Sequence, residues 1–461
     1  MCAAAEERAA GARRWGLYVH LPFCRQKCFY CDFPSYAGQE GRMAVYIEAL
    51  LGELAREGAP LRAAWGPPRT VYLGGGTPTA LPPALMERLL SGLREFLSGG
   101  PEERFDAAGE GAPPHAAVDV DRAAVAAAAS AGQTAPSAVA NAGGTAAAGA
   151  ALRPAVSAEE VAPCPAVPAV CEFTCECNPG TVDAAYLSLL RAGGVNRLSF
   201  GVQTFDDALL RRIGRIHTAA EACAAVRQAR AAGFRNLSLD LMYGLPGQTR
   251  AGLEASVRQA LALAPQHISI YGLQVEEGTA FARARAAGRL ALPSDEESEA
   301  MYDYMTTALP AAGYARYEIS NFARQGYESR HNLGYWQDVP YLGVGAAAHS
   351  YLDGQRYENP RGIEEYLAAL RASGRARREE EPLTRATSME EFAFLALRMA
   401  RGIDRARFAA RFGCELASVY ADAIARMRAR GFLEEDVQGV RLTPLGMKYG
   451  NWVFEAFLLD E

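Results

Sequence analysis

Short apolar segments alternate with longer amphipathic segments through the first 280 residues of the chain. The apolar segments have the length and composition of buried strands, and helix-forming stretches lie between most of them. Alternation of this kind predicts a parallel sheet built from βα units. The expected strands are residues 17–21, 70–73, 172–177, 197–202, 237–242 and 268–273, and the expected helices lie around 43–56, 83–97, 184–192, 219–232 and 253–263.

One internal segment does not follow this pattern. Between Phe105 and Phe173 the chain has no aromatic residue, and Ala, Gly, Pro and Val dominate. Such a segment has little bulky apolar surface to offset the entropy lost on ordering. We therefore expect residues 99–170 to form a mostly disordered insertion within the barrel.

After about residue 300 the pattern changes to helices with short connections. Three helices are expected at 389–401, 404–412 and 415–430, followed by two short strands at 432–434 and 440–442. This order resembles a winged helix, a shape sometimes used on DNA. The acidic balance of the chain favours a structural or partner-docking role instead. The expected organisation is an N-terminal tail (1–15), a barrel (16–300) and a mainly α C-terminal domain with a winged-helix-like end (301–461).

Composition constrains location and partners. The formal net charge is −6 and the pI is about 5.7, which argues against a nucleic-acid partner. No apolar run reaches the roughly 18 residues of a transmembrane helix, and residues 1–15 lack the apolar core of a signal peptide. Ten cysteines are too few for a disulfide framework in a chain of 461 residues. We expect a cytoplasmic protein without a transmembrane segment.

Three cysteines follow the first expected strand at a spacing that suits a metal cluster. Cys24, Cys28 and Cys31 supply three thiolates, one fewer than a closed tetrahedral site needs. A [4Fe–4S] cubane held by three cysteines keeps one iron without a protein ligand. Such an open position allows a metal centre to bind substrate, as catalytic zinc sites do. The alternative is a structural zinc site with His20 or Asp32 as the fourth ligand.

Polar residues gather at the carboxyl ends of the later expected strands. Residues 74–78 form a Gly-Gly-Gly-Thr-Pro turn after the second strand, where glycines let the backbone approach a ligand. Strand alternation places Glu176, Gln203 and Asp240 on the polar face of their strands. Arg215 lies between two helical stretches and could form a charge-assisted bond to a carboxylate. Carboxyl ends of parallel strands meet at one edge, so these groups are expected to share one site.

Together these motifs resemble the oxygen-independent coproporphyrinogen III oxidase superfamily of radical S-adenosylmethionine (SAM) proteins. The resemblance rests on Y-V-H-L-P-F-C, G-G-G-T-P, E-C-N-P-G-T, G-V-Q-T-F, R-I-G-R-I-H and L-D-L-M-Y-G-L-P-G-Q-T, in that order. It implies an open (β/α)6 barrel with its functional groups at the carboxyl ends of the strands. It further implies a [4Fe–4S] cluster on the three cysteines and a SAM site formed by Tyr18, Tyr30, Gly75, Gly76, Thr77, Glu176, Gln203, Arg215 and Asp240.

Within this superfamily the chain is more similar to the HemW branch than to the oxidases. The decarboxylating oxidases carry a further cysteine where this chain has Phe33, and they have a longer arm before the barrel. Residues 331–336 read H-N-L-G-Y-W and match an element of the HemW branch, whose members are regarded as heme-binding chaperones. The resemblance implies a bound heme, with His331 as an axial ligand, transfer of heme to an acceptor protein, and a low-potential electron donor. SAM-dependent decarboxylation of coproporphyrinogen III is the alternative.

Overall fold

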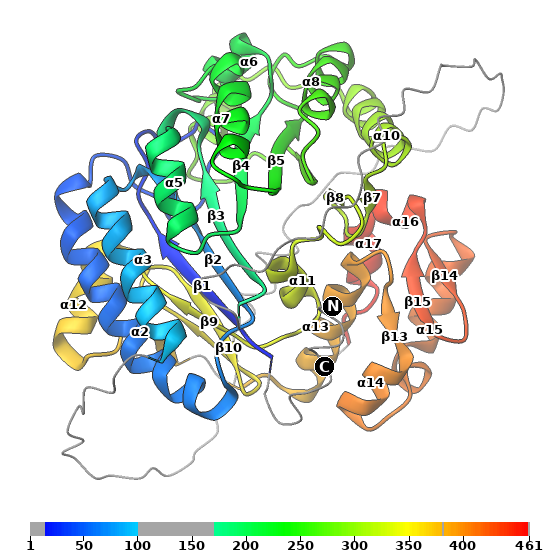
Figure 1. Ribbon diagram of the computed structural model, residues 1–461. Helices are drawn as coiled ribbons and strands as arrows, with labels where there is room; N and C mark the ends of the chain where they lie inside the picture. The colour runs from blue at the N-terminus through cyan, green and yellow to red at the C-terminus, as the bar shows by residue number, and fades with distance from the viewer. Residues whose placement is uncertain (1–13, 100–169, 380–381, 460–461) are drawn as a thin grey trace.

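The computed structural model describes residues 14–99, 170–379 and 382–459. The expected N-terminal tail and the Ala-rich segment lie almost wholly outside these ranges, so the disorder expected for residues 99–170 stays a prediction. Figure 1 shows a curved sheet with helices along its outer face and a smaller C-terminal domain beside it.

The centre of the sheet consists of six parallel strands in the order in which they occur along the chain. Each strand pairs in parallel with the next one, and each lies close to its predicted bounds. This confirms the predicted parallel sheet built from βα units. The strands are β1 (Gly16–Leu21), β2 (Thr70–Gly75), β3 (Glu172–Cys177), β4 (Arg197–Gln203), β5 (Asn236–Tyr243) and β6 (His267–Gly272).

Helices cover the outer face because the outward positions of every strand are apolar. In β5, Leu237, Leu239 and Leu241 are fully buried in the main core, whereas Asp240 faces the barrel interior and is half-buried. Thr218 caps α7 (Ala219–Ala231) through the reciprocal contact with Glu221 that is typical of a capping box. The covering helices are α2 (Met43–Trp65), α3 (Pro83–Ser98), α5 (Ala184–Ala192), α6 (Asp207–Arg212), α7 (Ala219–Ala231) and α8 (Arg250–Ala262).

The sheet continues on both sides with strands from later in the chain. β9 (Tyr341–Val344) pairs in parallel with β1, and β10 (His349–Leu352), β11 (Gln355–Glu358) and β12 (Arg378–Glu379) follow it. Beyond β6 lie β8 (Asn321–Ala323) and β7 (Ala315–Arg316). One twelve-stranded sheet therefore includes residues on both sides of the boundary expected at residue 300. The hydrophobic cores divide later, between Ala376 and Met389.

Further helical elements lie between the strands along the chain. They are η1 (Glu40–Arg42), η2 (Pro78–Ala80), η3 (Pro179–Thr181), α9 (Ala280–Ala286), α10 (Asp295–Ala311), α11 (Arg330–Trp336) and α12 (Ile363–Ser373). Within the described ranges, no helix has both the length and the apolar character needed to cross a bilayer.

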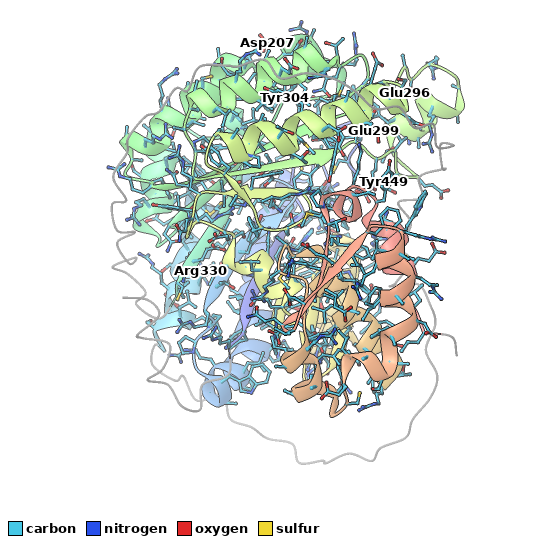
Figure 2. The ribbon with its side chains drawn as sticks, turned by 90° about the vertical axis from the view of Figure 1, so that its right-hand side faces the viewer. Asp207, Glu296, Glu299, Tyr304, Arg330 and Tyr449 are labelled. Carbon is cyan, nitrogen blue, oxygen red and sulfur yellow. The ribbon has the colours of Figure 1, made fainter. Side chains whose placement is uncertain are left out.

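The C-terminal domain has its own core and is mainly helical. It contains the three expected helices and a small antiparallel sheet, which gives the predicted winged-helix-like end. The strands of this sheet lie in the order β13 (Ile403–Asp404), β15 (Gly439–Leu442) and β14 (Leu433–Glu435). Tyr449 donates its hydroxyl hydrogen to Glu299 of α10 at 3.0 Å, which joins this domain to the barrel (Figure 2). The elements are α13 (Arg385–Arg398), β13 (Ile403–Asp404), α14 (Arg405–Phe412), α15 (Leu416–Ala429), β14 (Leu433–Glu435), β15 (Gly439–Leu442), α16 (Pro444–Lys448) and α17 (Gly450–Glu455).

Candidate functional site

The three candidate cluster ligands lie in the loop that follows β1. Cys24, Cys28 and Cys31 are free thiols, and each is half-buried. The loop is tied to the turn after β2, where the backbone N–H of Thr77 donates to the carbonyl of Phe23 at 2.7 Å. Burial raises the pKa of the Cys24 and Cys31 thiols, so iron must displace their protons when a cluster binds.

Two glycines allow the β2 turn to lie directly against this loop. A Cβ atom at Gly76 would be 2.7 Å from the carbonyl oxygen of Phe23 and 3.1 Å from the sulfur of Cys24. Gly75 has a φ of +110°, and a Cβ atom there would be 2.7 Å from the ring of His20. A side chain at Gly76 would displace the cysteine loop, and one at Gly75 would displace the His20 ring.

The geometry does not favour the zinc alternative. Among the described residues, no three His, Cys, Asp or Glu side chains converge as they would around a single ion. A cubane differs because each of its cysteines binds a different iron. His20 is committed elsewhere, since its Nδ1 is 3.0 Å from the Tyr18 hydroxyl and its Nε2 is 2.9 Å from the Pro34 carbonyl. Burial lowers the pKa of His20 to about 4, so the ring is neutral.

A chain of hydrogen bonds connects two of the cysteines through three polar side chains. The sulfur of Cys24 is 3.5 Å from the Thr77 hydroxyl, which accepts a bond from the Asn178 amide at 2.8 Å. The Asn178 side-chain oxygen accepts from Arg215, and Arg215 Nη1 donates to the sulfur of Cys28 at 3.5 Å. Thr77 and Arg215 were expected in the site, whereas Asn178 was not. A cation and a donor network beside the thiols suit an anionic cysteine-ligated cluster.

Glu176 lies at the carboxyl end of β3, half-buried beside the β2 turn. Its carboxylate accepts a bond of 2.8 Å from the Tyr72 hydroxyl. Burial raises the pKa of Glu176 to about 7, although the bonds from Tyr72 and the Gly75 backbone oppose this shift. A carboxylate with free acceptor capacity is available here for a ligand that carries hydrogen-bond donors.

Asp240 lies in the middle of β5, on its interior face, and is oriented by neighbouring hydroxyls. Ser199 donates to its carboxylate at 3.0 Å and Ser238 at 3.2 Å. Burial raises the pKa of Asp240, while bonds from serine side chains and the charge of Arg197 oppose the shift. The serines fix the carboxylate in one orientation, as a site for vicinal hydroxyl groups would require.

Gln203 ends β4 in an unusual backbone conformation. Its φ is +67°, in the left-handed region that non-glycine residues rarely occupy, and the register of β4 against β5 shifts between Gly201 and Gln203. Strain of this kind tends to concentrate at functional sites. A Cβ atom at Gly201 would be 3.1 Å from both Arg215 and the Gln203 amide, so these two predicted residues do lie together.

The two remaining expected SAM contacts are Tyr18 in β1 and Tyr30 in the cysteine loop itself. Tyr18 is in the barrel interior, bonded to His20 and tilted against the Tyr72 ring with 6.2 Å between centroids. Tyr30 packs against the small apolar cluster that contains Ile213. Burial raises the pKa of the Tyr30 hydroxyl, and the neighbouring Cys28 thiol acts in the same direction.

A buried carboxylate supports the site from behind β1. Glu53 of α2 accepts from the Gly345 backbone at 2.8 Å, from the Tyr366 hydroxyl at 2.7 Å and from the Asn359 amide at 2.7 Å. Gly345 lies so close to β1 that a Cβ atom there would be 2.5 Å from the carbonyl oxygen of His20. Burial raises the pKa of Glu53 to about 7 despite its three donors.

His331, expected as a heme ligand, is in the first turn of α11 and is 3% exposed. Its Nδ1 is 2.9 Å from the Thr70 hydroxyl and its Nε2 is 2.8 Å from the Tyr335 hydroxyl. Burial lowers the pKa of His331 to about 3. Axial ligation would require one of these bonds to break, so this role stays a prediction.

Sequence reasoning missed the residues that orient the expected ligands. Tyr72, Asn178 and Ser199 each bond to a predicted site residue. Asn178 stands inside the quoted E-C-N-P-G-T motif, and strand alternation places Tyr72 and Ser199 on the same interior face as Glu176 and Asp240. The parity argument could therefore have found Tyr72 and Ser199, and the motif already contained Asn178.

Comparison with known proteins identifies the family of the chain. The Radical SAM superfamily pattern matches residues 18–110 and 142–260, and the HemN C-terminal domain pattern matches residues 383–449. The chain is 33% identical over 445 residues to the protein named Heme chaperone HemW of Bacillus subtilis (strain 168), covering 96% of this chain and 98% of that protein. It is 30% identical over 454 residues to the protein of the same name from Escherichia coli (strain K12), with the same two coverages. The chain belongs to the HemW family of radical SAM proteins.

The fold of this HemW-family chain is also that of a solved oxidase. The structure described as coproporphyrinogen III oxidase (HemN) from Escherichia coli, a radical SAM enzyme, aligns with a TM-score of 0.72 and 22% identity. The alignment covers 98% of this chain and 91% of that chain. At this identity the likeness establishes the fold. The radical SAM domain itself implies a [4Fe–4S] cluster and SAM, and the cysteines, glycines and polar strand ends described above fit both groups.

Proposed function

We propose that this HemW-family chain is a cytoplasmic heme chaperone that binds a [4Fe–4S] cluster, SAM and heme, and transfers the heme to an acceptor protein. The observation that carries the proposal is Phe33, whose side chain is 63% exposed in the cysteine loop. A phenyl ring at the place of the oxidases' further cysteine supplies neither a thiolate nor a hydrogen-bond donor. The names of the nearly full-length relatives support the same function.

The residues of the barrel mouth would hold the [4Fe–4S] cluster and SAM as follows. Cys24, Cys28 and Cys31 would bind three irons, and SAM would bind at the fourth. Glu176 would accept hydrogen bonds from SAM, and Asp240 would accept them from ribose hydroxyls. When bound, the reduced cluster and SAM supply one-electron chemistry, and a low-potential donor would deliver the electron.

Two histidines are candidates for the axial ligand of heme. His331 is buried, and both of its ring nitrogens are hydrogen-bonded. His349 begins β10 and is exposed. Heme ligation needs an accessible imidazole nitrogen, and exposure favours His349.

Heme titration of three proteins tests this assignment. Wild type, His331→Ala and His349→Ala would be titrated with hemin, and the Soret band would be followed. We expect His349→Ala to weaken binding about tenfold or more, with a shifted Soret band, whereas His331→Ala would retain the wild-type band. The opposite pattern would assign the ligand to His331, and unchanged spectra in both variants would exclude both.

Anaerobic turnover separates the chaperone from the oxidase. Cluster-reconstituted protein would be incubated with coproporphyrinogen III, SAM and a low-potential reductant, and the products would be analysed by mass spectrometry. We expect no decarboxylated porphyrinogen from protein with an intact cluster. Multiple-turnover loss of CO₂ would instead identify an oxidase that works with phenylalanine at position 33.

A further inference from the structure

Helix α11 has two faces that contact different parts of the molecule. His331 and Tyr335 are four residues apart and share the face toward the barrel interior, where the two side chains bond to each other. Leu333 and Trp336 pack against the core of the C-terminal domain. Figure 2 shows Arg330, the first residue of this helix, beside the barrel strands. Helix α11 contains the H-N-L-G-Y-W segment that was expected to bind heme. It lies between the barrel and the core of the C-terminal domain.

The start of the helix is fixed to the strand that carries Glu176. Glu172 of β3 is 2% exposed, and its two carboxylate oxygens accept the backbone N–H groups of Arg330 at 2.9 Å and His331 at 3.0 Å. A carboxylate at a helix N-terminus satisfies donors that have no partner within the helix. On the opposite face, Arg398 of the C-terminal domain lies over the Trp336 ring at 4.4 Å. The helix is thus held from both sides.

The His331 ring packs directly on the tyrosine that contacts Glu176. The rings of His331 and Tyr72 stack with 5.1 Å between centroids and an interplanar angle of 29°. Thr70 and Tyr335 hold the two nitrogens of the imidazole, so the ring has one orientation. The Tyr72 hydroxyl, at the far end of the stacked ring, donates to Glu176 at 2.8 Å.

We propose that His331 is a positioning residue of the SAM site, which holds the Tyr72 ring so that its hydroxyl orients the Glu176 carboxylate toward SAM. The inference rests on the proposed binding of SAM by Glu176. It gives the histidine of the H-N-L-G-Y-W segment a function that requires both ring nitrogens to be occupied, as they are here. The ring acts by its fixed orientation and its flat face, and it does not itself touch SAM.

SAM affinity is the measurement that tests the proposal. Binding of radiolabelled SAM to cluster-reconstituted protein would be measured by anaerobic equilibrium dialysis, with iron and sulfide content determined for every variant. We expect Tyr72→Phe, which keeps the ring and removes the donor, to weaken SAM binding about tenfold, as for a hydrogen bond to a charged group. We expect His331→Leu to weaken it by a similar factor. Asn332→Ala, the next residue of the same helix, is the control and should keep wild-type affinity.

A double variant shows whether His331 acts through Tyr72. If it does, His331→Leu should cause no further loss of SAM affinity when Tyr72 is already phenylalanine. Losses that multiply in the double variant would overturn the proposal, because the two residues would then act independently. Wild-type SAM affinity in His331→Leu would overturn it as well.

A more conservative variant keeps the proposal testable if His331→Leu does not fold. Tyr335→Phe keeps the aromatic packing around His331 and removes only the bond to its Nε2, so it should fold and weaken SAM binding by a few fold. Unchanged SAM affinity in folded Tyr335→Phe and in folded Thr70→Val together would also contradict the proposal.

Glu176→Ala distinguishes failure of the proposed SAM site from failure of the role proposed for His331. If it binds SAM normally, the proposed SAM site is wrong, whereas a loss in Glu176→Ala without a loss in His331→Leu refutes only the role of His331.

Discussion

The guanidinium of Arg215 donates to the sulfur of Cys28 at 3.5 Å, although the two residues are 187 positions apart in the chain. The contact places a permanent positive charge beside a proposed cluster ligand, and the same guanidinium reaches Cys24 through Asn178 and Thr77. Charge and hydrogen bonds near the sulfurs set the reduction potential of an iron–sulfur cluster. The residue that connects the cysteines is therefore also placed to tune the cluster.

Replacing Arg215 by Gln should make the cluster harder to reduce. Loss of the positive charge destabilises the extra electron, so the midpoint potential should fall by tens of millivolts. Potentiometric titration followed by electron paramagnetic resonance would measure it. Arg212→Gln is the matched control, because Arg212 lies on α6 and donates to the Pro246 carbonyl instead of a cysteine. Equal potentials in wild type and Arg215→Gln would show that this charge does not act on the cluster.

Gly76→Ala should reduce cluster content without unfolding the protein. The added methyl group would meet the Phe23 carbonyl and the Cys24 sulfur, so the cysteine must move. Iron and sulfide per chain after reconstitution should fall to less than about half of the wild-type value. Gly52→Ala is the control, since a Cβ atom there meets nothing within 4 Å. A full cluster complement in Gly76→Ala would contradict the close packing of the β2 turn on the loop.

Cys28→Ala should abolish the iron–sulfur absorbance and leave heme binding largely intact. The cluster loses one of three proposed ligands, whereas neither candidate heme histidine contacts this thiol. Visible spectra after reconstitution and hemin titration of the same sample would provide both readouts. If heme binding disappeared together with the cluster, the two sites would not be separate.

The buried Glu53 should make the protein less stable at neutral pH than at mildly acidic pH. The folded state raises the pKa of Glu53 from 4.5 to about 7, so the folded protein binds this proton more tightly than the unfolded chain does. The free energy of unfolding should therefore fall as the pH rises from about 4.5 to about 7, by roughly 3 kcal/mol at most, and then level off. Above pH 7 this group should contribute no further pH dependence.

Denaturant unfolding at several pH values would measure this effect. Glu53→Gln should have a lower free energy of unfolding at every pH, because the NH2 group of the glutamine would face the donors that bond to the Glu53 carboxylate. It should also lose the part of the pH dependence that comes from Glu53. Glu176 has a shift of the same sign, so the difference between wild type and Glu53→Gln isolates Glu53. Parallel pH profiles for the two proteins would contradict the assignment.

The central sheet could be predicted from sequence because the two patterns that indicate it, apolar runs and the alternation of polar and apolar residues, are local. Buried parallel strands are nearly continuous apolar runs, and the alternation within β3, β4 and β5 already distinguished interior polar residues such as Glu176 and Asp240 from those that face helices. The strands from β7 to β12 were not predicted. They are short, some only two residues long, and their place in the sheet depends on pairing with distant strands.

The surroundings of His331 could not be predicted for a related reason. The sequence places it beside Asn332 and four residues before Tyr335, but its stacking partner Tyr72 and its bond to Thr70 come from a strand more than 250 positions earlier. The H-N-L-G-Y-W motif was recognised from the sequence, whereas the burial of His331 arises from tertiary contacts. The same applies to Glu53, whose three donors all come from residues 345–366.

The pairing of β9 with β1 has a consequence for biosynthesis. The strand that carries the cysteine loop leaves the ribosome early, but its edge partner and the Gly345 backbone that packs behind His20 are translated only after residue 340. Until then β1 has an unpaired edge, which is open to wrong partners. Iron–sulfur assembly on the nascent chain should therefore wait for nearly three quarters of translation. A chain truncated before Tyr341 should keep all three cysteines and yet take up little cluster.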